Sequence, residues 1–340
     1  MQVVQVLQVA LKTDLQDWQD WQDRKTKAQR LLNRKIRPMK ITYLILAGLM
    51  TTAVLCAQQT PISENYFMDK YSLAPSYAGN FNPKYLITGY RSDWSGIKGG
   101  PKTLRITYND VLPFMSNAGY GGKIIFDKAG IFSQLYIMGS YSYNLKVAEG
   151  HQVMFGLSAG IYHNSINLSE YYNDPDYTID PALLNGDVKS KIKFMSDFSA
   201  VYAWNGLETG LLFSNISFGD ASYKEVALKY NPLSNFQFHA TYLINIAEDW
   251  EVAPLLIVRG GKYIKSQFEL ASQVLYMKRF WGSLVFRDPG VLGFGLGASI
   301  GKGLKIGYSF NFATNVALGI YNNHEVSIGF NLFEYLKKKE

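Results

Sequence analysis

The chain has 340 residues and a formal net charge of +7; 47% of its residues are hydrophobic, 15% are aromatic and one, Cys56, is cysteine. The aromatic content and the 18% share of charged residues exclude an intrinsically disordered chain, and a lone cysteine excludes an intrachain disulfide framework. Residues 1–57 hold nine Lys and Arg against four Asp, so the remaining chain is nearly neutral and its charge gives no reason to expect nucleic-acid binding.

The N-terminal part differs in composition from the rest. Residues 1–38 are polar, and we interpret them as a misassigned translation start or a disordered extension. Residues 39–57 have a basic start, the apolar stretch Ile41–Leu55 and a small residue, Ala57, which together predict a secretory signal peptide cleaved after that alanine. The alternative is a lipoprotein acylated at Cys56, which the large leucine before the cysteine disfavours.

Residues 58–83 follow, and Pro75 and Gly79 within them oppose a regular strand. From residue 84 to 335 apolar residues alternate with polar or small ones, most regularly across Gly290–Phe333. Strands of about 10 residues with one apolar face predict an all-β fold, a transmembrane antiparallel β-barrel of about 14 strands. A soluble β-sandwich is the alternative. In the barrel, we expect 58–83 to be an irregular segment near or in the lumen.

The candidate strands and their connections can be placed in order. The strands span approximately 84–91, 102–111, 120–127, 133–145, 151–163, 191–203, 206–214, 235–245, 249–259, 265–277, 279–287, 291–300, 303–313 and 324–335. Short turns follow strands four, six, eight, ten and twelve, and longer links follow strands one, five, seven and thirteen. Sorting of turns and loops to opposite ends is typical of outer-membrane barrels. Pro254 predicts a kink or bulge in the ninth strand, and residues 336–340 form a charged tail.

No motif for catalysis, nucleotide binding or metal binding stands out, so we expect neither an enzyme nor a cofactor. The four histidines are scattered and are interpreted as polar lumen or interface residues. The loop 171–181 contains three aspartates but lacks the spacing of a calcium loop.

Three predicted loop segments instead carry aromatic or cationic side chains suited to protein contacts. They are the glycine-rich stretch 90–103, the loop 171–181 and the loop 218–232. The candidate partner-contact residues within them are Trp94, Lys98, Tyr171, Tyr172, Tyr177 and Tyr223.

Several short motifs occur together in one order along the chain. They are Tyr71–Gly79 (Tyr-Ser-Leu-Ala-Pro-Ser-Tyr-Ala-Gly), Arg91–Thr103 with its Trp-Ser-Gly-Ile-Lys-Gly-Gly-Pro-Lys-Thr, Phe126-Asp127 with Gly130, Ser140–Tyr143, Trp281-Gly282 with Phe286-Arg287, Gly307–Phe310 and His324-Glu325. Over residues 58–335 the chain resembles the PorP/SprF family. It departs from the family's motifs in having Leu-Ala-Pro-Ser for Asn-Pro-Ala, and Asp93 for a glutamine.

The resemblance implies an outer-membrane barrel of the Bacteroidetes type IX secretion and gliding machinery that is not an enzyme. It implies partners of two kinds besides outer-membrane lipids: secreted surface proteins with a C-terminal sorting domain, such as adhesins, and periplasmic components of the machine. We therefore expect a barrel that supports export or surface attachment by protein–protein docking, in the bacterial outer membrane. The alternative is a passive channel for small solutes.

Overall fold

The computed structural model describes residues 63–167, 188–218, 221–222, 229–230, 235–261, 264–301, 303–314 and 322–336. The long strands are β1 (Tyr85–Asp93), β2 (Lys102–Leu112), β3 (Met115–Ala129), β4 (Phe132–Ala148), β5 (His151–Ile166), β7 (Lys193–Trp204), β8 (Leu207–Phe218), β11 (Asn235–Tyr242), β13 (Trp250–Gly261), β14 (Ile264–Tyr276), β15 (Phe280–Arg287), β16 (Val291–Ile300), β17 (Leu304–Ala313) and β18 (Asn322–Asn331). The interpretations of residues 1–57, and the tail beyond Leu336, lie outside the described residues.

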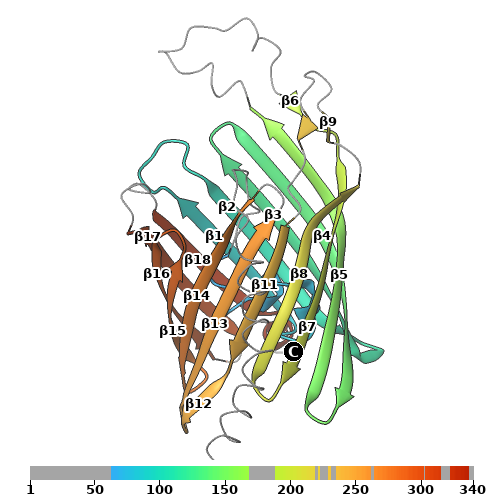
Figure 1. Ribbon diagram of the computed structural model, residues 1–340, viewed down its shortest axis with the longest axis vertical. Helices are drawn as coiled ribbons and strands as arrows, with labels where there is room; N and C mark the ends of the chain where they lie inside the picture. Colours follow the sequence, from blue (N-terminus) through green and yellow to red (C-terminus); the bar gives the residue numbers. More distant parts are fainter. Residues whose placement is uncertain are drawn as a thin grey trace, which may run out of the picture. The chain divides into compact units, whose positions relative to one another are not determined.

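The strands form a closed antiparallel barrel (Figure 1). β1 pairs with β18, and β11 pairs with both β8 and β13, so the sheet returns to itself. The short β12 (Ile244–Ala247) continues β11 after a break at Leu243, and β6 (Val188–Lys189) is a two-residue addition beside β5. Within the part that the structure describes, fourteen strands therefore make the wall, which confirms the prediction. β9 (Ala221–Ser222) and β10 (Lys229–Tyr230) pair separately.

The alternating pattern decides which face of the wall is apolar. In β16, Leu292, Phe294 and Leu296 are exposed on the outside, whereas the intervening Gly293 and Gly295 are buried. Many large apolar side chains across the strands are exposed in this way, whereas arginine, glutamate and asparagine side chains are buried inside. An apolar outside with a polar interior is the pattern of a membrane barrel and the reverse of a soluble sandwich. No helix in the described ranges is both long and apolar enough for a membrane span.

The connections differ in length at the two ends of the barrel. Turns such as Glu149–Gly150 and Asn205–Gly206 have two residues, and the latter pair takes positive φ values of 44° and 85°, as tight hairpins require. We call this the turn end; β1 begins there, and the short helix α3 (Leu332–Leu336) follows β18 there. The opposite, loop end carries the eight-residue hairpin 94–101 and the long links after β5, β8 and β17.

Of the kink or bulge predicted at Pro254, the bulge is absent from the pairing with β14. The register between β13 and β14 passes through the pair Pro254–Ser272 without a shift, and its one irregularity lies between Arg259 and Gly261. On the other side of β13, the pairs with β11 end at Leu255 and the pairs with β12 begin at Val252, so Pro254 lies within the break in pairing between these two strands. Because the neighbouring strand is interrupted there, the missing proline N–H removes no ladder hydrogen bond from that side.

Candidate functional site: a plug in the barrel lumen

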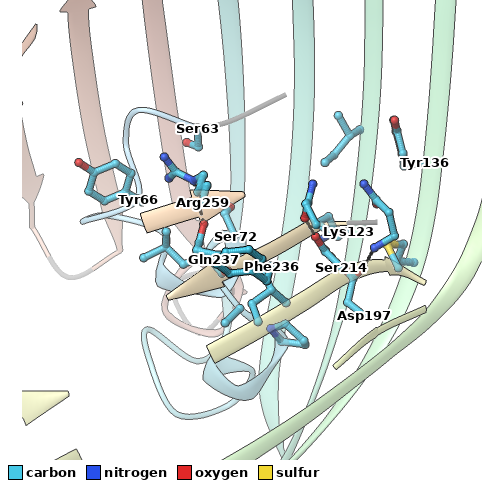
Figure 2. A pocket seen from close by; sticks show the side chains of 18 of the residues that line it. Ser63, Tyr66, Ser72, Lys123, Tyr136, Asp197, Ser214, Phe236, Gln237 and Arg259 are labelled. Atoms are coloured by element: carbon cyan, nitrogen blue, oxygen red, sulfur yellow. Dashed lines mark hydrogen bonds and ion pairs between the residues drawn. The ribbon is translucent and has the colours of Figure 1, made fainter. Parts of the chain in front are cut away.

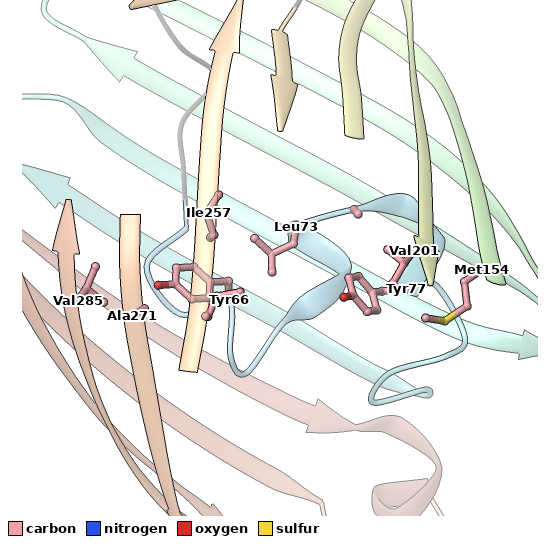
Figure 3. Close-up of a cluster of buried hydrophobic side chains, with 10 residues drawn as sticks. Tyr66, Leu73, Tyr77, Met154, Val201, Ile257, Ala271 and Val285 are labelled. Carbon is pink, nitrogen blue, oxygen red and sulfur yellow. The ribbon is translucent and has the colours of Figure 1, made fainter. Parts of the chain in front are cut away.

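Residues 63–83, which we call the plug, lie inside the barrel (Figure 3). They form two single turns of 3-10 helix, η1 (Lys70–Ser72) and η2 (Pro75–Tyr77), where a proline with its fixed φ begins the second turn. Tyr66, Tyr71 and Tyr77 are at most 2% exposed. The plug buries its apolar side chains against one another and against the inward side chains of the wall, which are Met154, Val201, Leu255, Ile257, Ala271 and Val285.

Glu64 anchors the plug near the loop end. Arg287 donates to its two carboxylate oxygens, from Nη1 at 3.0 Å and from Nη2 at 2.7 Å, and Arg91 Nη1 donates at 2.8 Å. A second carboxylate, that of Glu325, accepts hydrogen bonds from the Ser63 hydroxyl and the Glu64 backbone N–H, both at 2.7 Å. Strands β1, β15 and β18 thus hold the start of the plug with charged groups that are almost wholly buried.

The ion pairs continue along the inside of the wall. Arg287 Nε donates to Glu269 at 2.6 Å, and Arg259 Nη1 donates to the same oxygen at 3.0 Å. Arg259 Nε also donates to Gln237 at 2.9 Å, and the amide of Gln237 returns to the plug at the carbonyl of Leu73, 3.3 Å away. One network therefore links the anchor at Glu64 to the middle of the plug.

Burial and the neighbouring arginines act in opposite directions on the pKa of Glu64. Burial by itself would raise the pKa of this carboxyl group, because it removes water from the charged form. Arg287 and Arg91 outweigh that penalty and hold the pKa of Glu64 below its ordinary range. The charged carboxylate is therefore the form that seats the plug. Removing one partner from such a buried ion pair typically costs about 3–5 kcal/mol, since it leaves an uncompensated charge.

A second anchor lies toward the turn end. The Tyr77 hydroxyl donates to Glu208 at 2.9 Å and lies 3.0 Å from His239 Nε2, while Lys70 Nζ donates to the same glutamate at 2.7 Å. Burial, followed by the charge of Glu208, raises the pKa of Tyr77, so that its hydroxyl stays protonated as the donor.

Two glycines in the wall let the plug approach closely. A Cβ on Gly156 of β5 would clash with the backbone of Ser76, and one on Gly119 of β3 would clash with the carbonyl of Ala78. Hydrogen bonds fix the plug at the same places, from Ser76 N to Ser199 Oγ at 2.9 Å and from the Ser142 hydroxyl to the Ala78 carbonyl at 2.5 Å. The wall and the plug are therefore shaped for direct backbone contact.

Cavities remain on both sides of the plug. One of about 110 Å³ lies toward the loop end, where Lys123, Asp197 and Arg259 contribute to its lining (Figure 2). Another of about 500 Å³ lies toward the turn end, with Trp281 and Lys305 among its lining residues. Tyr66 and Leu73 line both cavities, so the plug stands between them.

Among the candidate partner-contact residues, Trp94 and Lys98 lie exposed in the hairpin 94–101 at the loop end. The hairpin is held in place because Asn322 accepts the backbone N–H of Trp94 at 2.7 Å and that of Ser95 at 2.6 Å. Arg91 connects it to the plug, since this arginine bonds both Glu64 and Asp93. The other four candidates, Tyr171, Tyr172, Tyr177 and Tyr223, lie outside the described residues.

Three of the four described histidines have side-chain contacts to neighbouring aromatic residues. His151 stacks on Trp204 with ring centres 5.3 Å apart, and His324 Nδ1 lies 2.7 Å from the Tyr308 hydroxyl. His239, 0% exposed, contacts the plug through Tyr77. In the ranges that the structure describes, no three His, Cys, Asp or Glu side chains are placed to hold a metal ion.

With this architecture in place, comparison with protein families gives one match, to "Type IX secretion system membrane protein PorP/SprF" over residues 55–330. The chain belongs to the PorP/SprF family. A PorP/SprF protein with this closed, apolar-faced wall is an outer-membrane β-barrel of the type IX secretion system, and no enzymatic family is indicated.

Solved structures with a similar fold include Omp33 of Acinetobacter baumannii (9% identity, TM-score 0.45, covering 72% of this PorP/SprF chain and 96% of that one). The CymD monoaromatic hydrocarbon channel shares 12% identity with a TM-score of 0.47, over 81% and 93% of the two chains. The KdgM porin shares 8% with a TM-score of 0.36, over 72% and 98%. At these values the likeness carries no functional inference. No curated protein sequence matches the chain.

Proposed function

We propose that this PorP/SprF barrel supports the export or surface attachment of secreted proteins by protein–protein docking, and that it is not a passive channel for small solutes. The observation that carries the proposal is the seating of the plug by Glu64 between Arg91 and Arg287. A diffusion channel needs a continuous wet path, whereas here charged and aromatic side chains of the plug occupy the lumen.

The loop end supplies a surface suited to docking. Trp94 and Ile97 are 40% and 44% exposed in a hairpin whose backbone is tied to neighbouring connections, from Trp94 to Asn322 and from Gly130 to Gly99. An exposed aromatic residue on a rigid support loses little conformational entropy on binding, which favours it as an interface anchor. Lys98 adds a cation to the same surface.

The partners follow from the secretion context of the family. At the loop end we propose a secreted surface protein with a C-terminal sorting domain, contacting Trp94 and Lys98 together with Tyr171, Tyr172, Tyr177 and Tyr223. At the turn end we propose periplasmic components of the machine. Outer-membrane lipids cover the apolar outer face of the wall.

The proposal is tested with two measurements on the same preparation. Affinity purification of the barrel from native outer membranes should recover a large surface protein or a periplasmic secretion component, and the purified barrel should give only sparse conductance in planar bilayers. Large ohmic conductance from a barrel that retrieves no partner would establish the channel function instead.

A further inference from the structure

The cavity of about 500 Å³ between the plug and the turn end has the size of a ligand site, since such sites typically measure about 300–1,000 Å³. Its lining begins at Tyr66 and Leu73 of the plug and continues to Gly206 and Lys278, in the turns after β7 and β14. The side chain of Lys278 is 78% exposed, so the cavity reaches the rim of the turn end. Because short turns of outer-membrane barrels lie in the periplasm, this cavity faces the periplasmic side.

One part of the lining is apolar and aromatic. The rings of Tyr66 and Phe67 lie with their centres 4.8 Å apart. The other large apolar residues around the cavity are Phe81, Leu255, Leu275 and Trp281. Such a lining suits an aromatic ring or a branched aliphatic group.

The charged residues of the lining are three lysines and two glutamates, and four of these five residues form pairs. Lys70 Nζ lies 2.7 Å from Glu208, and Lys278 Nζ lies 3.3 Å from Glu251. These two pairs carry no net charge, so the charge of the cavity is set by the third lysine.

That lysine is Lys305, the second residue of β17. Its ammonium group donates to the amide oxygen of Asn82 at 2.7 Å and lies 4.8 Å from the centre of the Tyr85 ring. It forms no ion pair with any residue in the described part of the chain. The lining therefore has one positive charge in excess, and this charge is at Lys305.

The surroundings of Lys305 supply donors for an anion. An ammonium group has three N–H donors, and Asn82 accepts one of them, which leaves two. Ser299 of β16 lies directly opposite Lys305 in the strand register, and both residues line the cavity. Residues placed in this way have Cβ atoms about 4.5–5.5 Å apart, so the hydroxyl and the ammonium group can donate to the same anion.

We propose that the turn-end cavity binds a carboxylate attached to an aromatic or branched aliphatic group, with the carboxylate at Lys305 and Ser299 and the apolar group between Phe67 and Trp281. A single excess charge matches a carboxylate better than a phosphate group, which carries about −1.5 to −2. Two sources share this chemistry: a small free acid, and the last residue of a polypeptide that reaches the cavity from the periplasm. The site is independent of the docking surface at the loop end.

Quenching of tryptophan emission in the purified barrel tests the proposal, because a nitroaromatic ring quenches a tryptophan that it contacts. The probes are (4-nitrophenyl)acetic acid and its neutral amide. The acid should give saturable quenching and bind about ten-fold more tightly than the amide, the effect expected of a charge-assisted hydrogen bond. The saturable signal should be lost in Trp281→Phe. Equal binding of acid and amide, no saturable quenching by either, or an unchanged signal in Trp281→Phe would each overturn the proposal.

Variants of the anion site give a second measurement on barrels that keep the mobility shift of a folded barrel. Lys305→Met should weaken binding of the acid about ten-fold and leave binding of the amide unchanged. Ser299→Ala leaves the contact between Lys305 and Asn82 intact and should also weaken binding of the acid. Lys146→Met, which removes an exposed lysine outside the cavity, is the matched control and should bind as native. Native affinity for the acid in both Lys305→Met and Ser299→Ala would place the carboxylate elsewhere and refute the proposal.

A short peptide that ends in 4-nitrophenylalanine distinguishes the two sources. If the peptide with a free C-terminus competes with the acid and its C-terminally amidated form does not, the site accepts the end of a polypeptide. If neither peptide competes while the acid still binds, the site is limited to small acids. Either result supports the carboxylate site, whereas equal competition by both peptides would contradict it.

Discussion

Glu64 and Arg287 are separated by 223 positions in the chain, yet Arg287 Nη2 donates to Glu64 Oε2 across 2.7 Å in the interior of the barrel. The side chains of both residues are at most 4% exposed. The contact joins the plug to the end of β15, and Arg91 joins the same carboxylate to β1. This carboxylate thus attaches the start of the plug to two strands of the wall.

Glu64→Gln is expected to loosen the plug without opening the wall. The amide keeps the shape of the side chain but removes the carboxylate that Arg91 and Arg287 share. Because Arg91 retains Asp93 and Arg287 retains Glu269, the cost to plug seating should be at or below the roughly 3–5 kcal/mol that is typical of breaking a buried ion pair. Planar-bilayer recordings should show more frequent conductance events than the sparse ones expected of the native barrel. Glu149→Gln, in an exposed turn, is the matched control and should behave as native. Equal recordings from both variants would contradict the anchoring role of Glu64.

The dependence of plug seating on pH should also report on Glu64. Because folding lowers the pKa of this group, its contribution to seating is complete above the ordinary value of 4.5 and is lost only as the pH falls through the lower folded-state value. Conductance should therefore stay sparse down to about pH 5 and increase in stronger acid. The Glu64→Gln barrel should show no such increase in conductance in acid. If its conductance instead rises in acid as the native conductance does, Glu64 is not the group responsible.

Gly156→Ala should destabilise the seated plug through a steric conflict. A methyl group at this position in β5 would meet the backbone of Ser76, which cannot move aside as a flexible side chain could. Overpacking of this kind typically costs about 1–3 kcal/mol. Gly139→Ala on β4 is the control, because no atom lies within 4 Å of its added Cβ. Thermal unfolding in detergent should separate the two variants, and coinciding curves would count against the packing described.

Leu284→Arg tests the lipid-facing assignment of the outer surface. Leu284 in β15 is 70% exposed on the apolar face, and an arginine on the lipid face of a barrel costs about 2–4 kcal/mol near the midplane. The yield of folded barrel in lipid vesicles, read from the mobility shift between unheated and boiled samples, should fall. Leu284→Met should fold as native. Full folding of the arginine variant would argue against contact with lipid.

Trp94→Ala tests the docking surface at the loop end. Loss of a central aromatic anchor typically costs about 2 kcal/mol, roughly thirty-fold in affinity, so far less surface protein should be recovered by affinity purification. The matched control is Phe114→Ala, which removes an aromatic side chain that is 80% exposed between β2 and β3 at the turn end. If both variants retrieve the partner equally, the contact lies elsewhere.

The wall of the barrel could be predicted from the sequence because each strand carries its own signal. The alternation in Leu292–Ile300 indicates which side chains face lipid without reference to any other strand. The short turns can likewise be recognised from a few consecutive residues. Pro254 misled the prediction of a bulge because its effect depends on the neighbouring strand, which is broken at Leu243.

The anchor of the plug could not be predicted in the same way. Glu64, Arg91 and Arg287 are each visible as charged residues, and the last two fall on the inward side of predicted strands. Their pairing depends on the order and tilt of all the strands between them, which no local pattern encodes. A buried charge near the loop end of several strands is the one signal that could have suggested the network.

The pairing of β1 with β18 along nine positions joins the first and last strands of the wall, and the plug bonds to both, through Arg91 and Glu325. This arrangement has a consequence for the order in which the parts of the barrel assemble. The Glu64 carboxylate binds Arg91 in β1 and Arg287 in β15, but its backbone N–H and the Ser63 hydroxyl find their acceptor, Glu325, only in the final strand. The complete set of partners for the start of the plug therefore exists only once β18 has joined β1, so we expect full seating of the plug to accompany closure of the wall.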